Sequence, residues 1–212
     1  MFSLNEIKYS YDEQFRLNLS HWEGSQGAHC LISGPSGCGK TTLLHLMAGL
    51  LTPQQGEIIV AGQNLRQLKS SALDQFRGQN LGIVFQRQHL VKVLTVFDNL
   101  LLAQNLAHIP ENKKRVTEVL SQLDLIIQQY AYPSTLSQGQ AQRVALARAV
   151  LNYPKVILAD EPTANLDDTH CLQVLNLLKN QAQKCNATLV IATHDSRIKQ
   201  HFSEQLTLKI AT

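Results

Sequence analysis

A glycine-rich segment with a single lysine carries the clearest chemical signal in this chain. It follows the spacing G-x-x-x-x-G-K-[ST] and consists of Gly34, Pro35, Ser36, Gly37, Cys38, Gly39, Lys40 and Thr41. Glycines allow left-handed turns that point successive backbone N–H groups inward, which forms a concave site for phosphate oxygens. Lys40 adds positive charge toward the outer phosphates, and the Thr41 hydroxyl is suited to Mg²⁺.

The residues on either side of this segment favour phosphate binding over a glycine-rich turn that binds nothing. A strand-like apolar run precedes it at residues 30–32, and a helical run follows it at residues 42–48. The unpaired N–H groups and the positive dipole end of that helix would face the phosphates. We therefore predict a nucleotide site.

Two adjacent carboxylates, Asp160 and Glu161, end an apolar strand predicted at residues 156–159. Ligands of open parallel sheets bind at the carboxyl ends of strands, so we expect this pair to meet the phosphate loop. Asp160 would hold Mg²⁺, directly or through water, and Glu161 would polarise the water that attacks the γ-phosphate. The alternative is a pair that caps the next helix; the phosphate loop in the same chain favours the catalytic interpretation.

Ser137 precedes another predicted helix, at about residues 138–151. Gln140 lies three residues later, which predicts a capping box. A second interpretation is that the free Ser137 hydroxyl and the Gly139 amide form another anion site at a helix N-terminus.

The elements that must position these groups are strands and helices in alternation. Strands are predicted at residues 2–8, 15–20, 57–60, 81–85, 156–159, 188–193 and 206–210, helical character at 88–136 and helices at about 138–151 and 171–185. Val116, Val119, Leu120 and Leu123 form one apolar stripe at helical spacing. Continuous apolar strands alternating with helices indicate a parallel sheet covered on both faces, and thus an α/β fold.

The composition is that of one globular domain. The chain has 212 residues, 44% of them hydrophobic, and no run approaches the ~20 apolar residues of a membrane span. A secretion signal is not evident. The four cysteines show no metal-ligand spacing, so reduced cytoplasmic thiols are expected. A net charge of +3 without a basic run gives little support for nucleic-acid binding, and the basic residues 113–115 are expected to form a solvated helix face.

Over essentially its whole length the chain resembles an ATP-binding-cassette (ABC) ATPase. That family's motifs occur here in the family's order: the phosphate loop, Gln86 after a strand, the signature at 136–140, the acidic strand end, the D-loop at 164–167 and the switch histidine His194. The resemblance implies a RecA-like core with a mainly parallel sheet, a small N-terminal antiparallel subdomain and a helical subdomain inserted at about 87–150.

The resemblance also implies roles for single residues. Tyr11 would stack on adenine, with Tyr9 as the alternative. Thr42 would contact an inner phosphate, and His194 would bind the γ-phosphate. Gln86 would reach Mg²⁺ and the attacking water, while its loop touches a membrane partner.

The remaining roles involve a second copy of the chain. In this family two subunits enclose two ATP molecules, so Ser137, Gly139 and Gln140 would face the nucleotide of the other copy, and Asp167 would help to position that copy. Gln138 stands where the family usually has glycine; because the phosphate contacts fall on Ser137 and Gly139, activity is expected to persist. Separate transmembrane permease subunits would hold the homodimer at the cytoplasmic face of the inner membrane.

Residues 77–86 and 158–167 look most like the branch that serves lipoprotein release, macrolide export and cell division. The alternatives are a small-molecule importer of the thiamine type and a non-transport ABC ATPase. Chromosome- and repair-type members insert a long coiled coil between loop and signature, and no sustained heptads separate Lys40 from Ser137 here.

Overall fold

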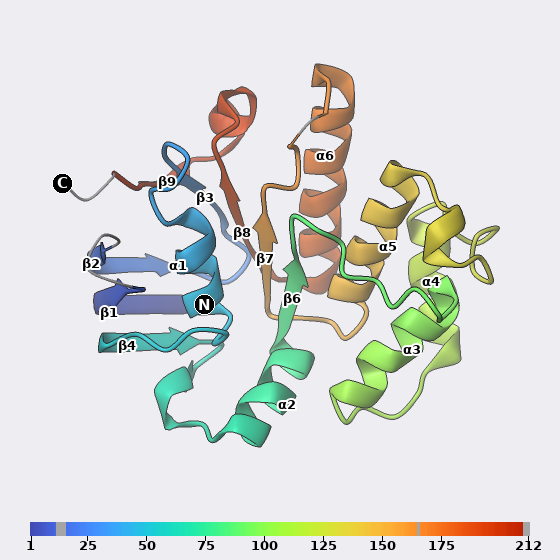
Figure 1. The fold of residues 1–212 in the computed structure, drawn as a ribbon, viewed down its shortest axis with the longest axis horizontal. Helices are drawn as coiled ribbons and strands as arrows, with labels where there is room; N and C mark the ends of the chain where they lie inside the picture. The colour runs from blue at the N-terminus through green and yellow to red at the C-terminus, as the bar shows by residue number, and fades with distance from the viewer. Residues whose placement is uncertain (12–15, 165, 210–212) are drawn as a thin grey trace.

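The computed structural model describes residues 1–11, 16–164 and 166–209, which form two sheets and the helices around them (Figure 1). The strands are β1 Phe2–Ser10, β2 Arg16–Gly24, β3 His29–Ser33, β4 Gln55–Val60, β5 Gln63–Asn64, β6 Leu81–Val84, β7 Val156–Asp160, β8 Thr188–Thr193 and β9 Glu204–Thr207. The helices are α1 Lys40–Met47, α2 Ser70–Asn80, α3 Val96–Leu106, α4 Lys113–Gln122, α5 Gln138–Val150 and α6 Asp168–Cys185, with 3-10 turns η1 Leu65–Gln67, η2 Pro133–Thr135 and η3 Ser196–His201.

The central sheet is parallel, in the order β6-β7-β8-β3-β9, as the sequence predicts. Successive side chains along each strand point alternately into two apolar clusters, one on each face of the sheet. Leu31, Leu189 and Ile191 belong to one cluster, whereas Ile32 and Val190 belong to the other. Because both faces are buried, the strands read as continuous apolar runs rather than as alternating ones.

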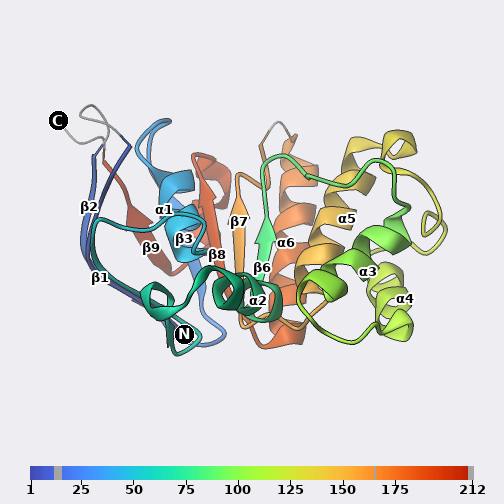
Figure 2. The ribbon, with the colours of Figure 1, turned by 60° about the horizontal axis from the view of Figure 1, so that its bottom comes forward.

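The two clusters define the layers of the molecule (Figure 2). One fills the space between the parallel sheet, α1 and the antiparallel sheet β2-β1-β4-β5. The other lies on the opposite face, under α5 and α6, with α3 and α4 farther out. Since all five central strands run the same way, the loops that follow β3, β7 and β8 emerge at one edge.

The helices between β6 and β7 pack through the predicted stripe. Val116, Val119, Leu120 and Leu123 are all buried. Asn99 on α3 is buried as well, and its side-chain amide donates to the carbonyls of Val91, Leu94 and Thr95, which fixes the turn before that helix. In the described part of the chain, no helix combines the length and apolarity needed to cross a membrane.

Several boundaries differ from the sequence predictions. The strand β2 extends to Gly24, past the predicted end at residue 20, and Phe15 lies outside the described residues. The strand β9 starts at Glu204, before the predicted residue 206, and residue 210 is not described. The helix α2 was not predicted; because it carries no fully buried residue, its apolar periodicity is weak.

The prediction of a solvated basic face at residues 113–115 is wrong for Arg115. Lys113 and Lys114 are exposed, but Arg115 is buried. Its guanidinium donates to the carbonyl oxygens of Leu151 and Val150 at 3.2 Å each and lies 3.9 Å from the centre of the Tyr153 ring. Arg115 therefore binds the end of α5, whose last carbonyls lack helical partners.

Arg115→Ala is expected to lower the free energy of unfolding by about 2 kcal/mol, because the buried Leu151 carbonyl loses its donor and the Val150 carbonyl keeps only the Tyr153 N–H and the Cys185 thiol. Urea unfolding followed by circular dichroism measures this change. Lys114→Ala, at the exposed neighbouring position, should stay within about 0.5 kcal/mol of the parent. An equal stability of the two variants would contradict the assigned role of Arg115.

Candidate active site

The segment between β3 and α1 folds as a tight loop that only glycine permits at its first position. Gly34 has φ 152°, and a Cβ there would lie 2.5 Å from the Leu208 carbonyl oxygen and 2.7 Å from Cys38 Sγ. Gly39, the N-cap of α1, has a left-handed φ of 102°. These conformations direct the chain into the helix, so the N-terminus of α1 opens at the loop.

Lys40 lies over this loop and is buried. Its ammonium donates to the carbonyl oxygens of Gly34 and Pro35 at 3.0 Å each and stands 3.8 Å from Glu161 Oε1. A cation is thus held between the loop and the acidic end of β7.

Thr41 and Asp160 meet directly. The Thr41 hydroxyl lies 3.1 Å from Asp160 Oδ1 and 2.9 Å from Oδ2, and it donates to this carboxylate. Burial raises the pKa of Asp160, and the hydrogen bond from Thr41 opposes that rise. The predicted meeting of the phosphate loop with the acidic strand end is confirmed.

Glu161 is held by the end of the neighbouring strand. It has a left-handed φ of 47°, rare for a residue with a side chain, and its N–H donates to Ala192 O at 2.8 Å. Its carboxylate accepts a 2.7 Å hydrogen bond from the Thr193 hydroxyl and one from the His194 backbone N–H at 3.2 Å. The His194 ring nitrogen Nδ1 lies 2.8 Å from Oε1. The turn and β8 together fix the direction of this carboxylate.

Lys40, Thr41, Glu161 and His194 line one open cavity of about 410 Å³, whereas Asp160 is buried behind Thr41 and lies outside the lining. Its lining residues are Tyr11, Ser36, Gly37, Gly39, Lys40, Thr41, Thr42, Gln86, Glu161 and His194. Tyr11 is 57% exposed and faces this cavity, whereas Tyr9 packs its ring edge-on against Tyr11 with the centroids 4.9 Å apart. Three residues of the phosphate loop do not line the cavity: Gly34 and Pro35 at its start, and Cys38, which is buried in the core.

Four predicted residues lie elsewhere. Ser137 and Gln140 form the predicted capping box at the start of α5, with the Gln140 N–H donating to Ser137 Oγ at 3.2 Å and the Ser137 N–H donating to Gln140 Oε1 at 2.9 Å. Gly139 is exposed in the first turn of that helix. Asp167 caps α6, where its side chain accepts a hydrogen bond from the His170 N–H at 2.9 Å. Hydrogen bonds from the His170 backbone and ring lower the pKa of Asp167.

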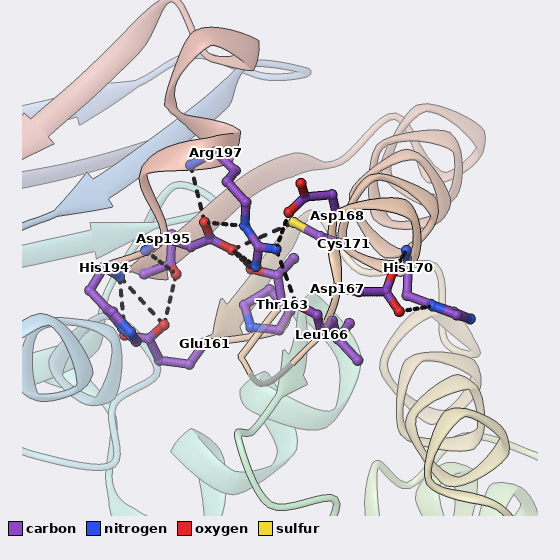
Figure 3. A network of polar contacts seen from close by, with 12 residues as sticks. Glu161, Thr163, Leu166, Asp167, Asp168, His170, Cys171, His194, Asp195 and Arg197 are labelled. Atoms are coloured by element: carbon purple, nitrogen blue, oxygen red, sulfur yellow. Dashed lines mark hydrogen bonds and ion pairs between the residues drawn. The ribbon is translucent and has the colours of Figure 1, made fainter.

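The structure adds Thr193, Asp195 and Arg197 to the residues around Glu161. Figure 3 shows Asp195 and Arg197 next to His194. Asp195 is paired with the Arg197 guanidinium, which holds the pKa of that carboxyl well below its usual range. Thr193 had a signal in the sequence, because it is a polar residue at the end of an apolar strand. Arg197 had none, since some of its partners lie 29 and 31 positions away along the chain.

Residues 17–164 match the family model described as ABC transporter. The chain belongs to the ABC transporter family. The resemblance inferred from the motifs is thereby confirmed, and the chain is an ATP-binding, ATP-hydrolysing cassette.

Relatives of this ABC ATPase are identical to it at more than a third of the aligned positions. The lipoprotein-releasing system ATP-binding protein LolD of Legionella pneumophila is 38% identical over 186 residues, which cover 87% of this chain and 82% of LolD. A protein of Staphylococcus haemolyticus named for hemin import, HrtA, is 38% identical over 181 residues, covering 84% and 80% of the two chains.

Solved cassettes have the same fold as this ABC ATPase. The dimeric structure of MJ0796, a bacterial ABC transporter cassette, superposes with a TM-score of 0.88 at 30% identity and covers 99% of this chain and 94% of that one. The same cassette, in a dimeric post-hydrolysis state bound to ADP and Pi, gives a TM-score of 0.87.

Lys40→Ala is expected to reduce ATP hydrolysis by at least about a hundredfold, because the cation of the cavity is lost. Phosphate release by the purified chain measures this. Lys69→Ala, an exposed lysine at the start of α2, is the matched control and should hydrolyse ATP at the parent rate. Undiminished turnover by the Lys40 variant would contradict the site.

Proposed function

We propose that two copies of this chain close around two ATP molecules, and that closing and hydrolytic opening drive separate membrane subunits. The observation that carries this proposal is the division of the motifs within one chain. The phosphate loop, Glu161 and His194 share a cavity, whereas Ser137 and Gly139 lie outside it at an exposed helix end. A second copy would supply the missing half, and the dimeric MJ0796 cassette supports that arrangement.

Within one half-site, the described contacts support a division of roles. The N-terminus of α1 and Lys40 bind the phosphate chain, Thr42 contacts an inner phosphate, and Tyr11 stacks on adenine. The side chain of Glu161, fixed by Thr193 and the His194 N–H, orients a water molecule for in-line attack and accepts its proton.

The oxygen donors at the cavity edge fit Mg²⁺. Thr41 and Asp160 are in contact already, and Gln86 lines the same cavity as Thr41, so a hydroxyl, a carboxylate and a carboxamide side chain are available at this end of the sheet. Hard oxygen ligands of this kind are those that Mg²⁺ prefers. When bound, the ion would neutralise charge on the outer phosphates.

The signature helix offers its N-terminus to the partner's nucleotide. Ser137 and Gly139 are exposed, and the positive dipole end of the thirteen-residue α5 favours an anion. Gln140 holds the turn through the capping box. Asp167, exposed at the start of α6, would contact the second copy beside it.

A groove of about 430 Å³ next to Gln86 is our candidate for the membrane subunit's docking surface. It lies between α2, α3, α5 and β6, and it includes Phe85 and the exposed apolar side chains of Leu50, Val91 and Leu106. Arg148 on α5 donates to the carbonyls of Gln88 and His89 at 2.8 Å each, so the loop after Gln86 is tied to the signature helix. A segment bound in this groove would therefore act on both halves of the ATP site, with the cassette at the cytoplasmic face of the inner membrane.

Among transport systems, we favour the branch of lipoprotein release, macrolide export and cell division, supported by LolD relatives at 36%, 38% and 39% identity. The similarity to a protein named for hemin import keeps small-molecule import as the second candidate.

Glu161→Gln is expected to slow hydrolysis about a hundredfold or more while an ATP-bound dimer accumulates. The amide oxygen still accepts the hydrogen bonds from β8, but the side chain no longer takes a proton. Light scattering with saturating ATP and Mg²⁺ measures the mass. Glu118→Gln, exposed on α4, makes the same chemical change away from the site and should behave as the parent. A Glu161 variant that stays monomeric under these conditions would refute the ATP-bridged dimer.

Ser137→Arg, made in the Glu161→Gln background, is expected to block dimerisation, because the longer side chain fills the space meant for the partner's phosphates. The ATP affinity of the single chain should hardly change. Ser137→Ala separates this steric effect from loss of the helix cap, which costs about 1 kcal/mol. If Ser137→Arg instead weakened ATP binding to the single chain as strongly as it weakened dimerisation, Ser137 would lie at the nucleotide of its own chain.

A further inference from the structure

The loop after β8 and the segment before α6 converge on one guanidinium group (Figure 3). Arg197 Nε and Nη2 donate to the two carboxylate oxygens of Asp195 at 2.9 and 2.7 Å. Its Nη1 donates to the Leu166 carbonyl oxygen at 3.0 Å and to Asp168 Oδ1 at 2.7 Å. A single side chain thus joins two loops that follow different strands.

This arrangement needs arginine. The planar guanidinium presents five N–H donors in a rigid fork, so it grips a carboxylate through two nitrogens while the third nitrogen reaches other acceptors. Lysine concentrates its donors on one atom and cannot span Asp195 and Leu166 in this way. Lys199, on the same 3-10 turn, is exposed and offers a control position with a basic side chain.

The contacts of Asp195 lead to the carboxylate that we assign to catalysis. The Asp195 N–H donates to Thr193 Oγ1 at 3.0 Å, and that hydroxyl donates to Glu161 Oε2 at 2.7 Å. The Asp195 side chain is only 10% exposed, and its charge is stabilised mainly by the Arg197 pairing. Thr163 Oγ1 at 3.1 Å and Cys171 Sγ at 3.5 Å also donate to this carboxylate. A continuous set of hydrogen bonds therefore runs from Glu161 to the Leu166 carbonyl.

We propose that Arg197 is a positioning residue that keeps the His194 loop in register with the Leu166–Asp168 segment. This rests on the proposed function, in which Asp167 meets the second copy and His194 meets the γ-phosphate. When the second copy fixes Asp167, the guanidinium fixes Asp195, the neighbour of His194. The switch histidine then reaches its working position as the pair closes, and hydrolysis is tied to dimer formation.

The test compares Arg197→Lys with Lys199→Ala in steady-state ATP hydrolysis by the full chain. Arg197→Lys keeps the charge near Asp195 but loses the link to Leu166, so kcat should fall about tenfold. Binding of ATP to the single chain should stay within about twofold of the parent, since the phosphate loop is untouched. Lys199→Ala should match the parent in both quantities.

Asp168→Ala supplies a second, milder break. The Asp168 side chain is 87% exposed, so its removal is compatible with folding, and it should lower kcat about twofold to threefold. Combined with Arg197→Lys, it should add nothing, because both changes break the same link. If Arg197→Lys does not fold, the Asp168 variant alone carries the test.

Two results would overturn the proposal. One is a kcat of Arg197→Lys equal to that of the parent, or of Asp168→Ala if the first variant does not fold. The other is an ATP affinity that falls in parallel with kcat. These are distinct from failure of the proposed function. A Glu161→Gln chain that never dimerises with ATP defeats the ATP-bridged dimer itself. If Glu161→Gln dimerises with ATP but Arg197→Lys hydrolyses ATP at the parent rate, only the positioning role of Arg197 is refuted.

Discussion

The adjacency of the ends of β7 and β8 is the constraint on which the whole site depends. Asp160 pairs with Ala192 in the parallel ladder, and the Glu161 N–H continues that pairing by donating to Ala192 O. The chain then turns through a left-handed residue, which brings the Glu161 carboxylate back against Thr193. Since parallel strands in register end together, two carboxylates and a histidine from distant parts of the sequence meet at one edge.

The phosphate loop reaches this edge from the other side. The strand β3 pairs with β8 from His29↔Leu189 to Ser33↔Thr193, so the loop begins level with the end of β8. The first turn of α1 then lies against β7, where Thr41 binds Asp160 and Lys40 approaches Glu161. The sheet register therefore sets the spacing between the nucleotide-binding and acidic halves of the site.

Local patterns were sufficient to predict the parts of the molecule whose cause is local. The capping box at Ser137, the stripe that contains Val119 and the apolar strand β8 each follow from spacing within a few residues. The phosphate loop is also local, and the meeting with Asp160 followed from a rule about strand ends. The candidate site was therefore predictable to the extent that it lies at the ends of buried strands.

What the sequence missed depends on partners far along the chain. Arg115 was predicted to be a surface charge because no residue near it in the sequence indicates its partners, the carbonyls at the end of α5, 35 and 36 positions away. The helix α2 rests on the core only through half-buried side chains such as Leu73 and Phe76, so its periodicity is faint. Arg197 binds Leu166 and Asp168, which lie 31 and 29 positions away near the start of α6, and no pattern of residue spacing in the sequence indicates these contacts.

The capping box of the signature helix has a consequence for a solitary copy. Ser137 and Gln140 satisfy each other's backbone donors, so the turn is ordered before any ligand arrives. The N–H groups of the exposed residues Gln138 and Gly139 belong to the first helical turn and remain as donors for an anion. A lone subunit thus presents a preorganised helix end, and little conformational entropy has to be lost there when two subunits associate.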